Sequence, residues 1–333
     1  MKRRAQRGAA LLIAMLTVAL VATLAAASLW QQWRSVEVET AERARVQSGW
    51  ILTGALDWAR LLLREDSMGN GGTVDHLGEP WAVPLQEARL SSFLAADKNN
   101  ATTDVGPEVM DAFLSGQIVD LQSLMNVNNL VTVNGQVSET DVEAFSRLFD
   151  LLGLPQSELS KMVENLRFAI AAGQVTPSPG AAPLWPQHVA ELVWLGLAPH
   201  TVAVLEPYVT LLPSSGARTT VNVNTAAAEV IAAAGDIDLS DAQRLVQIRN
   251  ASYFRNIADI QSHLGDSSGA QNLGSTLGVR SDYFEVRARL RLDQLVVEER
   301  SMVWRQGTNV TVLRRERGAP DPTAMSRIAV SQR

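Results

Sequence analysis

The chain has 333 residues, which is long enough to bury a sizeable core in one large domain or in two modest ones. Its formal charge is -6, and this acidic balance argues against nonspecific nucleic-acid binding by the surface as a whole. The absence of cysteine excludes disulfides, thiolate metal sites and cysteine nucleophiles. The four histidines are too far apart for zinc-ligand spacing: His76, His188, His200 and His263.

The amino terminus combines a basic leader with a long uncharged run. Four of the 29 basic residues precede Gly8, so the chain without residues 1–8 would carry 29 − 4 = 25 basic and 35 acidic groups, or -10. The next charge after Arg7 is Arg34, and the residues between them would rise about 39 Å as a helix, enough to cross a bilayer. The leader would stay in the cytoplasm. The alternative is a secretory signal peptide that is cut near Ala27.

The following residues, 34–65, contain no proline and consist of good helix formers. The sequence therefore predicts one helix from Ala9 to Glu65, about 85 Å long, whose second half is amphipathic. Trp50 and Trp58 are expected to pack this helix onto a sheet. Its apolar side chains recur near helical spacing: Val46, Trp50, Leu52, Leu56, Ala59, Leu62 and Leu63.

Strand-like stretches follow the glycine-rich segment after this helix. They are predicted at 81–85 and 116–123, and Asn134-Gly135 has the composition of a type I′ hairpin turn. Near the carboxyl terminus, apolar and charged residues alternate over 283–292, and two more strands are predicted at 294–305 and 308–316. These three strands predict an antiparallel meander.

The stretch between the two groups of strands is predicted to be mainly helical. Ser138 with Asp141 predicts the start of a helix that ends near Gly153, and a second helix is expected over 156–173. A proline-rich linker follows, and then shorter helices are expected around 187–195 and 199–206.

Residues 221–260 resemble a helix-hairpin-helix unit. Asn224 or Thr225 is expected to cap a helix through Ala234, and Ser240 to cap a second helix through about Arg249. Such units often bind DNA phosphates through hairpin amides, but three carboxylates here would repel phosphate: Asp236, Asp238 and Asp241. The pattern favours packing or partner contact. The alternative is a membrane-anchored, competence-type DNA-binding protein.

Two further motifs contain residues typical of catalytic or metal sites. The "GDSSG" at 265–269 matches a hydrolase nucleophile elbow, but Ser267 lacks the strand before it and the helix after it, so a secreted hydrolase is a weak third reading. Asp97, Asn99 and Glu108 match an EF-hand count, yet Thr102 stands where the loop needs glycine. The acidic hairpin around Asp236 is an equally weak metal candidate. We expect no catalytic residue and no enzyme activity.

The leader ending in Gly8, the small residue Ala9, the membrane-length helix and the amphipathic stem together resemble the type IV pilin and pseudopilin family. The resemblance implies that a prepilin peptidase cuts between Gly8 and Ala9 and methylates the new amine. Most members carry glutamate at mature position five, where this chain has Ile13. An unpaired carboxylate in a membrane costs about 2.5–3.5 kcal/mol, and family members are thought to pair it with a neighbouring subunit's amine.

The missing glutamate, the "IVDLQSLMNVNNL" stretch and the "NVNTA" pattern resemble the K-type minor pseudopilins of type II secretion. The resemblance implies an α+β fold in which a pilin-like long helix packs on an antiparallel sheet that carries an inserted all-α domain. The expected division is 1–8 leader, 9–33 transmembrane helix, 34–66 stem, 67–125 first sheet part, 126–280 insert, 281–316 second sheet part and 317–333 tail.

This resemblance also implies a function. The chain would cap the tip of the pseudopilus and help initiate its assembly for export of folded periplasmic proteins, because a large insert fits an open end better than a packed shaft. Expected partners are the I-type and J-type minor pseudopilins, other pseudopilins and the prepilin peptidase, with no nucleic acid. The resemblance implies a single-pass inner-membrane protein with a periplasmic body that can bind calcium. Stem contacts are hypothesised at Trp50, Leu52 and Leu56.

Overall fold

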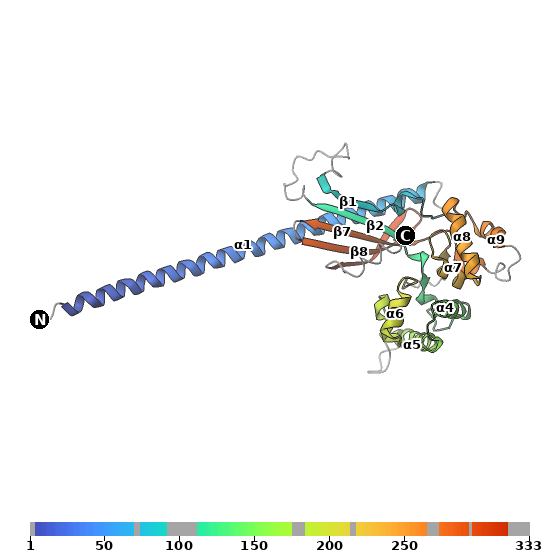
Figure 1. Ribbon diagram of the computed structural model, residues 1–333, viewed down its shortest axis with the longest axis horizontal. Helices are drawn as coiled ribbons and strands as arrows, with labels where there is room; N and C mark the ends of the chain where they lie inside the picture. Colours follow the sequence, from blue (N-terminus) through green and yellow to red (C-terminus); the bar gives the residue numbers. More distant parts are fainter. Residues whose placement is uncertain are drawn as a thin grey trace.

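The computed structural model describes residues 4–69, 74–91, 112–174, 184–213, 218–264, 273–292 and 295–318. Helix α1 (Arg4–Met68) is one uninterrupted element of 65 residues, which confirms the predicted continuous helix. It is about 97 Å long at 1.5 Å per residue. Figure 1 shows its amino-terminal half projecting alone from the body, and every residue from 9 to 43 is exposed.

The carboxyl-terminal half of α1 packs on a five-stranded antiparallel sheet of order β1-β2-β7-β8-β9. β2 and β7 are neighbours although the helical insert separates them in sequence, with Asp120 opposite Phe284. The predicted meander is confirmed in β7 to β9. The five strands are β1 (Leu85–Arg89), β2 (Phe113–Asp120), β7 (Tyr283–Leu292), β8 (Leu295–Gln306) and β9 (Asn309–Gly318).

The strand predicted at 81–85 is wrong. Residues Pro80–Ala82 form a 3-10 turn, η1, that buries Trp81, and the strand begins only at Leu85. Pro80 and Pro84 lack the N–H groups that a strand over this stretch would donate. The sheet's last strand also runs two residues past the predicted end at 316.

Apolar and charged residues alternate along β7, and the apolar ones form the core between the sheet and α1. The alternate residues of β7 from Phe284 to Leu292 are buried as predicted. One cluster joins Leu56, Ala59 and Leu63 of α1 to the sheet, and a second joins Leu52 to it. Trp50 was predicted to be buried and is 74% exposed, because its helical position lies opposite the buried side chains. Trp58 is 46% exposed and only partly covered, at the edge of the sheet contact.

The described residues from Met125 to Leu277 form a separate hydrophobic core. Short turns η2 (Leu121–Ser123) and η3 (Val127–Asn129) lead into it. Two small parallel pairs, β3 (Met125–Asn126) with β4 (Val209–Thr210) and β5 (Val221–Asn222) with β6 (Leu277–Gly278), cross this region. Its helices are α4 (Glu139–Leu151), α5 (Gln156–Gln174), η4 (Val189–Leu195), α6 (Pro199–Leu205), α7 (Ala228–Gly235), α8 (Leu239–Ala251), α9 (Ile257–Leu264) and α10 (Leu273–Thr276). The fold is α+β, as predicted.

Local signals in this helical region were mostly correct. Ser138 caps α4, accepting from the Asp141 N–H at 3.4 Å, and Gly153 follows the helix with a φ of 67°. The turn at Asn134-Gly135 exists but is not type I′, because Gly135 has a positive φ and Asn134 does not. The Thr132 N–H donates to the Gln136 carbonyl, which makes a three-residue loop.

Candidate functional site

The exposed half of α1 is the most distinctive surface of the molecule. An 18-residue window within it is long and apolar enough to cross a membrane, and none of that window is buried against the rest of the chain. Gly8 and Ala9 lie in the helix just after its start at Arg4, and Ile13 is 64% exposed. A solvent-facing apolar cylinder of this length is unfavourable in water and fits a single membrane anchor.

The three hypothesised stem contacts do not share one face. Trp50 points away from the body and is available to a partner. Leu52 and Leu56 are 0% and 4% exposed and pack against the chain's own sheet. The hypothesis is therefore corrected for Leu52 and Leu56, since a neighbouring subunit could not reach them without unpacking this one.

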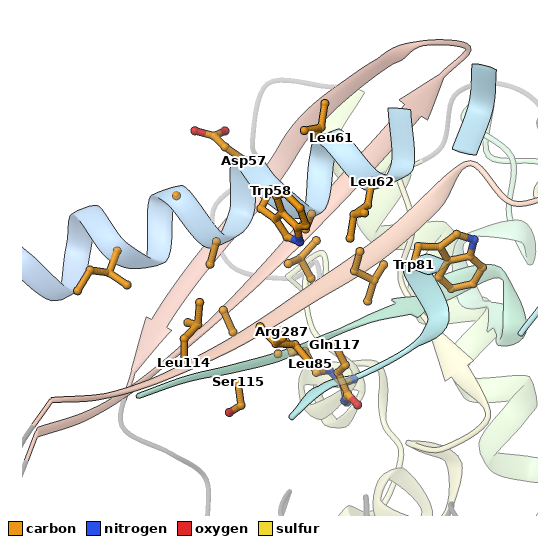
Figure 2. A pocket seen from close by; sticks show the side chains of 18 of the residues that line it. Asp57, Trp58, Leu61, Leu62, Trp81, Leu85, Leu114, Ser115, Gln117 and Arg287 are labelled. Carbon is orange, nitrogen blue, oxygen red and sulfur yellow. The ribbon is translucent and has the colours of Figure 1, made fainter. Parts of the chain in front are cut away.

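A groove with a volume of about 520 Å³ lies between the stem and the sheet, and the sequence did not reveal it. Figure 2 shows Trp58 and Leu62 of α1 on one side and Leu85, Leu114 and Gln117 on the strands opposite. It forms where α1 crosses the β1–β2 side of the sheet, and its lining residues come from four separate segments. Periodicity within one segment therefore could not predict it.

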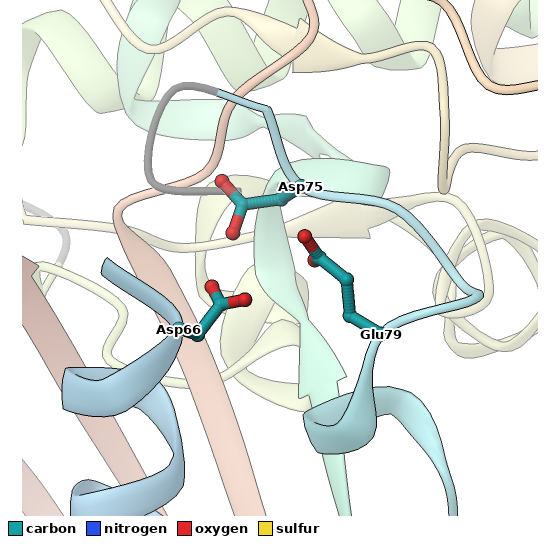
Figure 3. Close-up of side chains that lie close together, drawn as sticks. All are labelled: Asp66, Asp75 and Glu79. Atoms are coloured by element: carbon teal, nitrogen blue, oxygen red, sulfur yellow. The ribbon is translucent and has the colours of Figure 1, made fainter. Parts of the chain in front are cut away.

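Three carboxylates converge where α1 ends. Asp66 belongs to the last turns of the helix, while Asp75 and Glu79 follow it, and one oxygen from each lies within 4.8 Å of the others (Figure 3). Arg305 of β8 is 1% exposed and donates to Asp66 at 2.7 Å and to Asp75 at 2.5 Å. The guanidinium therefore supplies positive charge to two of the three carboxylates.

Burial shifts the titration of this cluster. It raises the pKa of Asp75 to about 6, although Arg305 pulls that pKa down. Burial also raises the pKa of Glu79 to about 7, while the His76 N–H and the Trp81 indole N–H donate to its carboxylate and oppose the shift. Burial lowers the pKa of Arg305, but Asp75 and Asp66 outweigh this effect and raise it above its usual range.

The cluster continues into a buried polar junction that joins the sheet to the insert. Asp120, at the end of β2, accepts from Ser281 Oγ at 2.6 Å, Thr225 Oγ1 at 2.5 Å and Asn222 Nδ2 at 3.1 Å. Asn222 Nδ2 also donates to the Asp75 carbonyl. Burial raises the pKa of Asp120. The junction thus fixes the helical region to the sheet through hydrogen bonds.

Of the residues predicted as metal ligands, the structure describes only Asp236, Asp238 and Asp241, which lie at the hairpin between α7 and α8 and do not converge on one point. Asp97, Asn99 and Glu108 lie outside the described residues, as does Ser267. Asp236 pairs with Arg147 at 3.3 Å and Asp241 with Arg244 at 2.9 Å. Within the described ranges, Asp66, Asp75 and Glu79 are the one group of three ligand-type side chains that converge. Calcium needs six to eight oxygens, and Arg305 already pairs with two of these three carboxylates, so the group does not fit calcium.

The helix-hairpin-helix unit is present in α7 and α8, but its predicted caps are wrong. Asn224 exchanges two hydrogen bonds with the backbone of Phe254, and Thr225 donates to Asp120, so neither caps a helix. α7 follows Ala227 and α8 follows Asp238. Asp236 occupies the hairpin with a φ of 54° and an exposed side chain, which is unsuited to a DNA phosphate.

A membrane-length helix that becomes the spine of an antiparallel sheet is the architecture of a pilin-like subunit. Models of one family, type II secretion system (T2SS), protein K, match residues 123–214 and 221–280. These matches support a K-type minor pseudopilin of type II secretion. Members are structural pseudopilins and not enzymes.

Similar proteins extend the match over most of the chain. The type II secretion system protein K of Pseudomonas aeruginosa is 29% identical over 313 residues, covering 87% of this chain and 86% of that protein. The protein K of Dickeya chrysanthemi is 24% identical over 365 residues, covering 95% and 98%. The crystal structure of the GspK-GspI-GspJ complex from enterotoxigenic Escherichia coli has the same fold, with a TM-score of 0.63, 18% identity and coverage of 84% and 99%.

Proposed function

We propose that this chain caps the tip of the type II secretion pseudopilus and helps initiate its assembly for export of folded periplasmic proteins. The observation that carries this proposal is the position of the helical region at the end of the body opposite the anchor (Figure 1). Subunits of a pilus-like fibre stack along their long helices. A head that extends beyond the end of α1 would collide with a subunit stacked above it, but fits an open end.

Ile13 also supports a place for this subunit at the tip of the pseudopilus. A glutamate at this place would need a partner amine from a neighbouring subunit to offset its cost in the membrane. Ile13 is apolar and needs none. A subunit at the open end, with no subunit above it, would lose nothing by this replacement.

We further propose that a prepilin peptidase cuts between Gly8 and Ala9 and methylates the new amine. Residues 9–33 would then hold the protein in the inner membrane, with the body from residue 34 onward in the periplasm. The test is the mass and amino terminus of the full chain, expressed with and without the peptidase. A start at Ala9 that depends on the peptidase supports this processing. A start at Ser28 in both cases contradicts it.

The partners proposed are the I-type and J-type minor pseudopilins, with other pseudopilins below them. The similar solved structure is a complex of GspK with GspI and GspJ, and this chain has the same fold. The division into an insert over 126–280 and sheet parts over 67–125 and 281–316 belongs to this proposal.

Deletion and complementation test the role in assembly. Cells that lack this chain should start few pseudopili and secrete poorly, and the full-length chain should restore both. A variant that keeps its Gly8 cleavage site but lacks residues 126–280 should restore membrane insertion without normal capping. Normal numbers of pseudopili in the deletion strain would contradict the proposed role in initiation.

A further inference from the structure

The loop that follows α1, residues 74–79, lies where the helical region meets the sheet. Toward the sheet, its Asp75 carboxylate accepts from the Arg305 guanidinium of β8 at 2.5 Å. Toward the helical region, its His76 ring stacks on the ring of Tyr253, which follows α8, with centroids 3.9 Å apart and planes within 10° of parallel. The loop therefore contacts both parts of the molecule, through two different side chains.

Glu79 holds His76 in this position. Its Oε2 accepts from the His76 N–H at 3.0 Å and from the Trp81 indole N–H at 2.6 Å. Glu79 is 6% exposed and Trp81 is 1% exposed, so these hydrogen bonds form away from water. A displacement of the Glu79 carboxyl group would move His76 and separate its ring from Tyr253.

The charges around Glu79 oppose its ionisation. One of its oxygens lies within 4.8 Å of an oxygen of Asp66 and of Asp75 (Figure 3), and both neighbours pair with Arg305. Within the described ranges, the one ion-pair partner of Glu79 is His76, with 3.8 Å between Nε2 and Oε1. A buried carboxylate beside like charges is unfavourable when ionised unless a cation offsets it. The charged and titratable groups that face the loop in the described structure are Asp66 of α1, Asp75 and His76 of the loop, Asp120 of β2, Tyr253 of the helical region and Arg305 of β8.

The carboxyl groups and the histidine respond to pH in opposite senses. Burial raises the pKa of Glu79 to about 7 and that of Asp75 to about 6, so their stabilising contribution is lost as the pH rises through these values. Burial lowers the pKa of His76 from 6.5, against the charge of Asp66, so its contribution is lost as the pH falls below 6.5. The His76 side chain is 20% exposed, against 7% for Glu79, so the carboxyl groups set the direction above pH 6.

We propose that this contact is a pH switch: protonated Glu79 keeps the 74–79 loop docked between the sheet and the helical region, and ionised Glu79 releases it. On release the carboxylate turns to water and gives up the His76 N–H. The His76 ring then leaves Tyr253, and the helical region can change its orientation on the sheet. The small pH range over which Glu79 titrates makes neutral pH the point of change.

Hydrogen exchange on the full chain in detergent tests the opening of the loop. After correction for the intrinsic effect of pH, protection of residues 74–82 should fall about tenfold between pH 5.5 and pH 8. Glu79→Gln, which cannot ionise, should keep its protection at pH 8. Glu87→Gln, at an exposed carboxyl group of β1, is the matched control and should behave as the unaltered chain. Equal protection of the unaltered chain at both pH values would overturn the proposal, as would an unchanged pH dependence in Glu79→Gln.

Spin-label distances test whether the helical region moves with the loop. The chain contains no cysteine, so Ser160→Cys on α5 and Thr311→Cys on β9, both at exposed positions, can be labelled as one pair. The distance distribution should be narrow at pH 5.5 and broader at pH 8, and narrow at both pH values when Glu79→Gln is added. A distribution that stays narrow at pH 8 while the loop loses protection would show that the loop opens alone, and would overturn the proposed movement of the helical region.

Discussion

The two regions of the molecule are stabilised in different ways. We call α1 with the five-stranded sheet the body, and the helical region from Met125 to Leu277 the head. α1 is joined to the sheet by two apolar clusters, around Leu52 and around Leu56 to Leu63, and the helical region has a third core of its own. Between body and head lies the polar junction of Asp75, Asp120, Asn222 and Arg305. The difference teaches that the head has its own core and is attached to the body by buried hydrogen bonds and by one small apolar cluster, in which Leu212 packs with Tyr283 and Met302. A pilin-like body can therefore carry it without rebuilding its own core.

The largest expected effect comes from the junction itself. Arg305→Ala would leave Asp66 and Asp75 without their guanidinium partner, and breaking a buried pair from one side costs about 3–5 kcal/mol. The free energy of unfolding, measured with denaturant, should fall by that amount. Arg291→Ala, which removes an exposed pair with Glu87, should change it by about 1 kcal/mol or less. Equal effects of the two variants would contradict the importance of the junction.

Core truncations should separate the two units. Leu63→Ala in the body and Leu166→Ala in the head remove fully buried side chains, and each should cost about 2–5 kcal/mol. Because the cores are distinct, calorimetry should show Leu63→Ala lowering the transition of the body and Leu166→Ala lowering that of the head. A single transition shifted equally by both would indicate one cooperative unit.

The junction should also respond to pH. The folded pKa values of Asp75 and Glu79, about 6 and about 7, lie above their ordinary values of 3.8 and 4.5. A raised carboxyl pKa stabilises the fold at pH values below the ordinary pKa, and this contribution is lost as the pH rises through the folded pKa. These two groups therefore favour the folded state more at pH 4.5 than at pH 7.5.

Glu79→Gln isolates that contribution. It should raise the free energy of unfolding at pH 7.5 by about 1 kcal/mol and flatten its dependence between pH 5 and pH 7.5. Glu87→Gln, at an exposed carboxyl of β1, is the control and should leave the pH profile unchanged. An unchanged profile in Glu79→Gln would show that Glu79 titrates normally.

The smallest effect is expected at the hairpin of the head. Asp236 is 67% exposed and makes one pair with Arg147, so Asp236→Asn should change the free energy of unfolding by about 1 kcal/mol or less. The unaltered chain should show no salt-dependent binding to duplex DNA in a fluorescence titration. Clear binding at low salt would reopen the DNA-binding alternative.

Local signals in the sequence predicted the elements better than their contacts. Continuous helix formers predicted α1, alternation predicted β7, and Ser138 predicted the start of α4, because each depends on residues nearby in the chain. Asn224 and Thr225 were misread as caps because their partners, Phe254 and Asp120, are 30 and 105 residues away.

The candidate site was only partly predictable for the same reason. The anchor follows from composition alone. The groove needs β1, β2 and α1 to be assembled, and the junction pairs Arg305 with Asp75 across 230 residues. Trp50 was misplaced because aromatic character predicts burial, whereas its position on α1 points it outward.

The central claim is that this subunit stands at the tip. Its most direct test is immunogold labelling of pseudopili with an antibody against the helical region. The account predicts label at one end of each fibre and none along the shaft. Label distributed along the shaft would contradict it, because the head would then have to be accommodated between stacked subunits.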